Sequence, residues 1–194
     1  MTHEHAMNKS ALRRQFRARR RALPADQRAA ADEAIAKHLR SLPAFQRAAA
    51  ILSYVSIPGD EAGTRDLLSQ LVEEGRFVLV PRSLPGGALA WHRFHGLSSL
   101  VEGRHGILEP APGAPAITSW PSPAVVLTPG AAFTPEGGRL GQGGGYYDRF
   151  LAEFSGVSIG LAYSCQITPS LPQSPHDYPV DYVITDETVY GASP

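Results

Sequence analysis

Hydrophobic and polar positions along the chain follow two repeating patterns. Near the N-terminus, Leu12, Phe16 and Leu23 recur at a spacing that places them on one face of a helix. Further along, short apolar runs of strand length alternate with segments of helical character. The predicted helices cover residues 8–22, 26–42, 64–74 and 146–154. The predicted strands cover residues 49–55, 77–80, 88–94, 125–127, 157–162 and 180–185.

Strands that alternate with helices indicate a mainly parallel sheet with helices on both faces. The expected fold class is therefore α/β, as a single three-layer α/β/α domain with an N-terminal basic helix. This domain should span residues 8–194, after a disordered N-terminal tail over residues 1–7. Ligands of such sheets bind beyond the carboxyl ends of the strands. Because the most glycine-rich loop follows the strand over residues 125–127, we expect the ligand site there. The proline-rich stretch over residues 109–123 is predicted to be irregular.

Composition narrows the possible function classes. The 18 basic residues balance 18 acidic residues, so the overall charge predicts no polyanionic partner, although seven basic residues fall between Lys9 and Arg21. Cys165 is the single cysteine, which excludes a disulfide within the chain and favours a reducing cytoplasm. No apolar run approaches the roughly 20 residues that cross a bilayer. We therefore expect a cytoplasmic protein that does not bind membranes.

The segment from Gly137 to Arg149 carries the candidate chemistry. Six glycines among residues 137–145 let the backbone approach a ligand and direct successive N–H groups at one anion. A predicted helix follows, and its N-terminal end favours phosphate. Arg139 offers a planar pair of donors to phosphate, and Asp148 offers a carboxylate to a hard cation such as Mg²⁺. The segment matches neither a P-loop nor a dinucleotide fingerprint, so a flexible connection stays an alternative.

A resemblance to a known family resolves this choice. The run Arg139-Leu140-Gly141-Gln142-Gly143-Gly144-Gly145-Tyr146-Tyr147-Asp148 resembles the signature of 5-formyltetrahydrofolate cyclo-ligases. The similarity extends over nearly the whole chain and keeps the family's order. Its further segments are Lys9 with Leu12-Arg13, Glu61 with Thr64, residues 106–110, residues 125–133, and residues 166–181.

The resemblance implies an ATP-dependent ligase that converts 5-formyltetrahydrofolate to 5,10-methenyltetrahydrofolate, with release of ADP and phosphate, through a phosphorylated formyl intermediate. Its partners would be ATP and 5-formyltetrahydrofolate, its cofactor Mg²⁺, and its catalytic residues Arg139 and Tyr146. The implied ATP-binding residues are Lys9, Arg13, Arg139, Leu140, Gly141, Gln142, Gly143, Gly144, Gly145, Tyr146 and Tyr147. The implied substrate-binding residues are Ile57, Glu61, Gln142, Gly143, Gly144, Gly145 and Tyr146. The implied metal ligands are Asp148 and Asp177.

Three positions depart from the family pattern. Thr134 stands where an aspartate commonly follows the phenylalanine, Gly63 stands where an acidic or amide residue is usual, and Gly144 stands where some members carry lysine. The departure at Gly63 puts one folate contact in question, and that at Thr134 removes one carboxylate near the glycine-rich loop.

Two alternatives compete with the cyclo-ligase hypothesis. One is another phosphate-binding α/β enzyme of the sugar-phosphate isomerase type, which would not need the Lys9–Arg13 cluster together with Asp148 and Asp177. The other is a nucleic-acid-binding protein that uses the cluster from Arg13 to Arg21. The balanced charge and the lack of aromatic residues interleaved with that cluster argue against the second alternative. We expect a monomer without a nucleic-acid partner.

Overall fold

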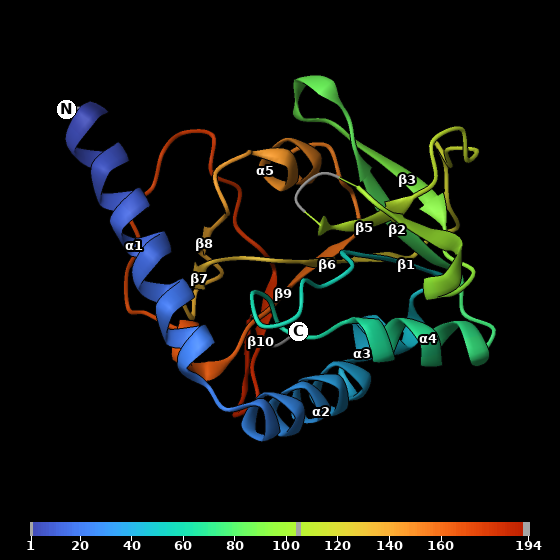
Figure 1. Ribbon diagram of the computed structural model, residues 1–194, viewed down its shortest axis with the longest axis horizontal. Coiled ribbons are helices and arrows are strands. Elements are labelled where there is room, and N and C mark those ends of the chain that lie inside the picture. Colours follow the sequence, from blue (N-terminus) through green and yellow to red (C-terminus); the bar gives the residue numbers. More distant parts are fainter. Residues whose placement is uncertain (1, 104–105, 192–194) are drawn as a thin grey trace.

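A computed structural model describes residues 2–103 and 106–191 of the chain (Figure 1). Its centre is a seven-stranded sheet with the order β11-β10-β9-β6-β1-β2-β3. The inner pairs are parallel, whereas β3 and β11 run antiparallel at the two edges. The strands of this sheet are β1 Ala50–Ser53, β2 Val78–Ser83, β3 Leu89–Arg93, β6 Ala124–Thr128, β9 Val157–Leu161, β10 Tyr182–Ile184 and β11 Val189–Gly191. The predicted α/β fold with a mainly parallel sheet is confirmed.

Helices cover both faces of the sheet. The helices α2 (Ala25–Ser41), α3 (Pro43–Arg47) and α4 (Arg65–Glu73) lie on one face, and α5 (Tyr146–Leu151) lies on the other (Figure 1). Alternation along β1 explains this, because successive side chains of a strand point to opposite faces. Ile51 packs in the cluster that contains residues of α2, α3 and α4, and Leu52 packs in the cluster that contains Leu151 of α5. The two clusters form the two cores of the three-layer domain.

Helix α1 (Thr2–Ala22) closes one end of the molecule (Figure 1). Its apolar face packs on a small hairpin of β7 (Ala132–Phe133) and β8 (Arg139–Leu140), where Phe16 joins Leu140 in a cluster of its own. Arg20 is fully buried and its Nη1 donates to the carbonyl of Gly130 at 2.9 Å. The helix begins at Thr2, within the segment predicted to be a disordered tail, while Met1 lies outside the described residues.

Several elements differ from the sequence prediction. A hairpin of β4 (Leu100–Glu102) and β5 (Leu108–Pro110) extends into the stretch expected to be irregular. The β7–β8 hairpin occupies part of the segment expected to be a loop, and helix α5 ends three residues before the predicted boundary. Such short elements carry too few residues to show a periodic pattern. Short 3-10 turns cover Pro85–Gly87, Leu97–Ser99 and Ser164–Gln166.

The end of α4 follows local sequence rules, but its beginning does not. Gly75 follows the helix with φ of +76°, a conformation that favours glycine after a helix. Thr64 precedes the helix without capping it by its side chain. Its hydroxyl instead donates to the carbonyl of Tyr54 at 2.8 Å and accepts the N–H of Ser56 at 3.0 Å. Thr64 therefore fixes the chain beyond β1, where the site lies.

Within the part of the chain that the structure describes, no helix combines the length and the apolar character needed to cross a membrane.

Candidate active site

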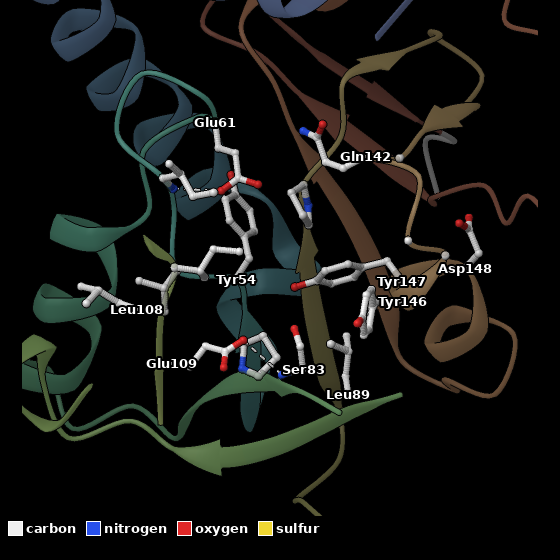
Figure 2. Close-up of a pocket in the computed structure, with 18 of the residues that line it drawn as sticks. Tyr54, Glu61, Ser83, Leu89, Leu108, Glu109, Gln142, Tyr146, Tyr147 and Asp148 are labelled. Carbon is white, nitrogen blue, oxygen red and sulfur yellow. Dashed lines mark hydrogen bonds between the residues drawn. The ribbon is translucent and has the colours of Figure 1, made fainter. Parts of the chain in front are cut away.

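A cavity of about 410 Å³ opens beyond the carboxyl ends of the central parallel strands (Figure 2). Tyr54 and Val55 follow β1, Ser83 ends β2, and Pro129 follows β6. The cavity is therefore where a mainly parallel sheet is expected to bind its ligand. It is lined by Tyr54, Val55, Ile57, Glu61, Pro81, Ser83, Leu89, Ile107, Leu108, Glu109, Pro129, Arg139, Gly141, Gln142, Gly144, Gly145, Tyr146, Tyr147 and Asp148.

The glycine-rich loop forms one wall of this cavity and connects β8 to α5. Gly143 and Gly145 have φ values of +110° and +67°, which L-residues with a side chain rarely adopt. The side chain of Arg149 folds back over the loop and donates to the carbonyl of Gly144 at 2.7 Å. The loop is thus a defined turn with exposed backbone, and its geometry supports a site for close backbone contact more than a flexible connection.

Arg139 and Asp148 form a buried ion pair beneath the loop. Arg139 is 7% exposed, and its Nη2 donates to Oδ1 of Asp148 at 2.5 Å. Burial lowers the pKa of Arg139, and the charge of Asp148 opposes that shift. The same Oδ1 accepts the backbone N–H of Tyr178 at 3.2 Å, so this ion pair also contacts the C-terminal segment.

The basic face of α1 approaches the loop from the side away from the cavity. Arg13 donates from Nε to the carbonyl of Gly141 at 2.8 Å. Lys9 forms an ion pair with Asp177 and donates to Oγ of Ser174 at 2.8 Å. Lys9, Arg13 and Asp177 do not line the cavity. The loop therefore separates an apolar cavity from a strip of charged side chains.

Glu61 and Tyr147 bring polar groups into the cavity from opposite walls, and Figure 2 shows the hydroxyl of Tyr147 directed into the space between them. Glu61 accepts the N–H of Ile57 at 2.9 Å, and burial raises the pKa of its carboxyl. Burial, followed by the charge of Glu61, raises the pKa of Tyr147. The Tyr147 hydroxyl is buried and has no hydrogen-bond partner among the described residues, so it is free to bind a ligand.

The predicted site residues fall into two groups in the structure. The larger group lines the cavity and consists of Ile57, Glu61, Arg139, Gly141, Gln142, Gly144, Gly145, Tyr146, Tyr147 and Asp148. The second group lies on the α1 side of the loop and consists of Lys9, Arg13, Gly143 and Asp177. A Cβ on Gly143 would lie 3.5 Å from the guanidinium carbon of Arg13. Leu140 does not line the cavity, because its side chain is buried against Phe16 of α1 in an apolar cluster. Any contact of Leu140 with a ligand would therefore use its backbone.

Several cavity residues were not predicted as site residues. Tyr54, Ser83, Leu89 and Glu109 come from segments that were predicted as strands, turns or irregular chain. Only Glu109 had a detectable signal, because it is a charged residue inside the otherwise apolar run from Ile107 to Pro110.

Asp148 and Asp177 are the predicted ligands of Mg²⁺. They lie near each other, since Tyr178, which follows Asp177, donates to Asp148 at 3.2 Å. Their hydrogen bonds to described residues use only Oδ1 of Asp148 and Oδ2 of Asp177, which leaves one oxygen of each carboxylate for a cation. Among those residues, no three His, Cys, Asp or Glu side chains gather around a metal position. Mg²⁺ commonly uses one or two carboxylates and completes its coordination with phosphates and water.

Comparison with known proteins agrees with this geometry. A family model described as the 5-formyltetrahydrofolate cyclo-ligase family matches residues 5–186. The chain belongs to the 5-formyltetrahydrofolate cyclo-ligase family. It is 32% identical over 180 residues to the 5-formyltetrahydrofolate cyclo-ligase of Escherichia coli (strain K12), a match that covers 90% of this chain and 98% of that protein. The corresponding enzyme of Mycolicibacterium smegmatis is 30% identical over 185 residues, covering 92% of this chain and 93% of that one.

Solved structures of the same family share the fold. The 5,10-methenyltetrahydrofolate synthetase of Aquifex aeolicus has a TM-score of 0.78 and 31% identity, with 94% of this chain and 92% of that chain covered. The synthetase of Mycoplasma pneumoniae has a TM-score of 0.71 and 23% identity, with 92% and 99% covered, and supports the fold alone. This cyclo-ligase family member is therefore an enzyme with the expected α/β architecture.

Two departures from the cyclo-ligase family pattern have structural explanations. Thr134 is buried in the β7–β8 turn, where its hydroxyl accepts the N–H of Gly138 at 3.1 Å, a bond that an aspartate could also make. Gly63 lies outside the cavity, and a Cβ there would be 2.3 Å from an oxygen of Asp32. That carboxylate accepts the N–H of Gly63 at 2.7 Å. Both positions thus stabilise local structure and do not contact the cavity.

Proposed function

We propose that this protein carries out the reaction of its family, the ATP-dependent cyclisation of 5-formyltetrahydrofolate to 5,10-methenyltetrahydrofolate. The observation that carries this proposal is the position of the glycine-rich loop between two unlike surfaces. One is the largely apolar cavity that ends at Glu61 and Tyr147. The other is the strip of Lys9, Arg13 and Asp177 beside α1. A flat pterin suits the first surface, and a polyphosphate suits the second.

The phosphates of ATP would bind between α1 and the loop. Backbone N–H groups around Gly143 and the N-terminal end of α5 favour an anion there. Lys9 and Arg13 add positive charge, although Lys9 is paired with Asp177 in this structure. Mg²⁺ bound at the free Oδ1 of Asp177 would share the negative charge of that carboxylate with Lys9 and so weaken the ion pair, which would let Lys9 contact phosphate.

The folate would occupy the cavity with its formyl group facing the loop. Tyr146 and Tyr147 supply aromatic and hydroxyl contacts, and Ile57 and Glu61 close the opposite side. Enclosure by these residues excludes water, which would otherwise compete for the γ-phosphoryl group. The loop backbone then contacts both substrates, and the γ-phosphate must extend past its edge into the cavity to meet the formyl oxygen in line.

The chemistry follows from the weakness of a formamide as an electrophile. The formyl oxygen takes the γ-phosphoryl group as the bond from phosphorus to the bridging oxygen breaks and ADP leaves. N10 then attacks the activated formyl carbon, N10 loses its proton, and the bond from carbon to the phosphorylated oxygen breaks to release phosphate. Phosphoryl transfer depends mainly on alignment and charge neutralisation, so no side-chain nucleophile is needed. Arg139 supplies fixed positive charge beside the loop.

Mg²⁺ would neutralise phosphate charge during the transfer and would be held by Asp148 and Asp177. Asp148 is already oriented by Arg139, and Asp177 by Ser174, whose N–H it accepts at 2.7 Å. Both carboxylates are therefore positioned before a cation binds.

The deciding experiment follows the absorbance of 5,10-methenyltetrahydrofolate as Mg²⁺ and ATP are titrated against 5-formyltetrahydrofolate. We expect product only when ATP is present. Asp148→Asn and Asp177→Asn should each raise the Mg²⁺ midpoint about tenfold or more, since each removes one charged ligand. Asp26→Asn, an exposed carboxylate at the start of α2, is the matched control and should behave like the parent. Product formation without ATP would contradict the proposed reaction, and parental Mg²⁺ midpoints in both site variants would contradict the metal assignment.

A further inference from the structure

Glu109 is a buried carboxylate whose hydrogen-bonding capacity is largely unused. It is 6% exposed and lines the cavity from β5. One oxygen, Oε1, accepts the N–H of Ser83 over a long 3.3 Å, and no ion pair with Glu109 occurs among the residues that the structure describes. A carboxylate has about four acceptor positions, and burying it without donors is costly. The remaining acceptor positions of Glu109 have no donor among the described residues and are available to a ligand.

The fold holds this carboxylate in place. Gly103 leaves room for it, because a Cβ there would lie 2.7 Å from Oε2 of Glu109. Arg82 of β2 donates to the carbonyl of Pro110, so the strand that carries Glu109 is tied to the main sheet. The bond from Arg82 and the pairing of β5 with β4 hold the backbone at Glu109, and its side chain lines the cavity. The arrangement is preorganised for a ligand of fixed geometry.

The position of Glu109 indicates which end of the pterin ring would lie next to it. Figure 2 shows Glu109 across the cavity from Gln142 and Asp148, on the side away from the glycine-rich loop. A pterin carries its N3–H and 2-amino donors at the end of the ring opposite N5. A ligand whose N5-formyl group faces the loop therefore presents this pair of donors to Glu109. Adenine offers one amino group beside an acceptor nitrogen, and phosphates would be repelled.

We propose that Glu109 anchors the pterin by accepting hydrogen bonds from N3–H and the 2-amino group. This inference rests on the proposed function and adds a residue that sets both specificity and orientation. Two parallel bonds to one carboxylate fix the ring in its plane, as a bidentate pair does in general. Pro81 and Leu89, which also line the cavity, supply apolar surface for the ring. The anchor at one end then aims the formyl group at the loop.

The test measures binding of 5-formyltetrahydrofolate and of MgATP separately, by calorimetry, with the full chain. Glu109→Gln should weaken folate binding at least tenfold and leave ATP binding within twofold. Glu109→Asp, which keeps the charge, should retain more folate affinity than Glu109→Gln. Glu102→Gln on the neighbouring strand β4 removes an exposed carboxylate and should bind like the parent. Unchanged folate affinity in Glu109→Gln would overturn the proposal.

A substrate analogue supplies an independent readout. The 5-formyl derivative without its 2-amino group should bind the parent at least tenfold more weakly than the complete substrate, and this loss should vanish in Glu109→Gln. An equal loss in both proteins, or no loss in the parent, would assign the amino group to another partner and overturn the proposal. If the variants fail to fold, the affinities of the parent protein for the two ligands are enough to test the proposal. Turnover of the parent, measured first, separates failure of this inference from failure of the proposed reaction.

Discussion

Glu61 shows how burial changes the chemistry of a single residue. Its carboxyl lies on the cavity wall, where desolvation raises its pKa more than the charge of Arg20 and the bond from the N–H of Ile57 lower it. The folded protein therefore holds a proton on Glu61 at pH values where the unfolded chain has lost it. Stability from this group is present at low pH and declines as pH rises through the folded pKa.

Glu61→Gln should accordingly raise the melting temperature at pH 7 and lower turnover. The neutral amide avoids the cost of burying a charge and can still accept the N–H of Ile57. The difference in melting temperature between the variant and the parent should shrink as the pH falls toward the ordinary pKa of glutamate, because Glu61 of the parent is then neutral too. Thermal melts of both proteins between pH 4 and pH 8 test this expectation. Glu73→Gln, which alters an exposed residue of α4, should show no comparable pH-dependent difference.

At the scale of one element, the loop from Gly141 to Gly145 contains two residues with positive φ, and its backbone lines the cavity. Both Gly143 and Gly145 have positive φ; a Cβ on Gly145 would lie 2.9 Å from Nη1 of Arg149, whereas a Cβ on Gly143 would only reach ordinary contact distance from Arg13. An L-residue in such a conformation costs about 1–3 kcal/mol. The loop retains this conformation because β8 and α5 fix its two ends.

Gly143→Ala and Gly145→Ala should each abolish most turnover while lowering the free energy of unfolding by about 1–2 kcal/mol. The added Cβ intrudes where the backbone must approach phosphate. Gly75→Ala is a matched control, because Gly75 has a φ of +76° and a Cβ added there would meet no atom within 4 Å. It should lose similar stability and keep full turnover. Parental turnover in both loop variants would show that the loop does not contact the substrates.

At the scale of the whole molecule, α1 joins the two ends of the chain at the site. Lys9 reaches Ser174 and Asp177, which are 165 and 168 residues away in sequence. Arg13 reaches Gly141 from the same helix. The docking of α1 does not depend on these charges alone, because Phe16 packs in the apolar cluster and Arg20 donates to Gly130.

Lys9→Ala and Arg13→Ala should therefore each raise the KM for ATP and change the melting temperature by only a few degrees. Loss of one charge-assisted contact to phosphate is worth about 1.5–3 kcal/mol, or roughly 10-fold to 150-fold in affinity. The KM for 5-formyltetrahydrofolate should change little. Arg14→Ala, which removes an exposed side chain of α1, is the control. An unchanged ATP dependence in both variants would place the phosphates elsewhere.

The sequence by itself determined the main elements and one wall of the site. Apolar runs and helical periodicity depend on neighbours within a few residues, so the central strands and the helices α2 and α4 were predicted close to their observed positions. The glycine-rich segment was likewise predicted as a site because its residues are contiguous. The β4–β5 and β7–β8 hairpins were not predicted, since their pairing depends on tertiary contacts more than on local pattern.

Only the tertiary structure decided the other walls of the site. Tyr54 and Ser83 meet in one cavity because the parallel strands β1 and β2 end at the same edge of the sheet, and the separate β4–β5 hairpin brings Glu109 to the same cavity. Whether a carboxylate such as Glu109 is solvated or buried without a cation depends on segments far apart in the chain, which no local pattern encodes. The same holds for the division of the loop into a cavity side and an α1 side, because that division exists only once α1 has packed against the β7–β8 hairpin.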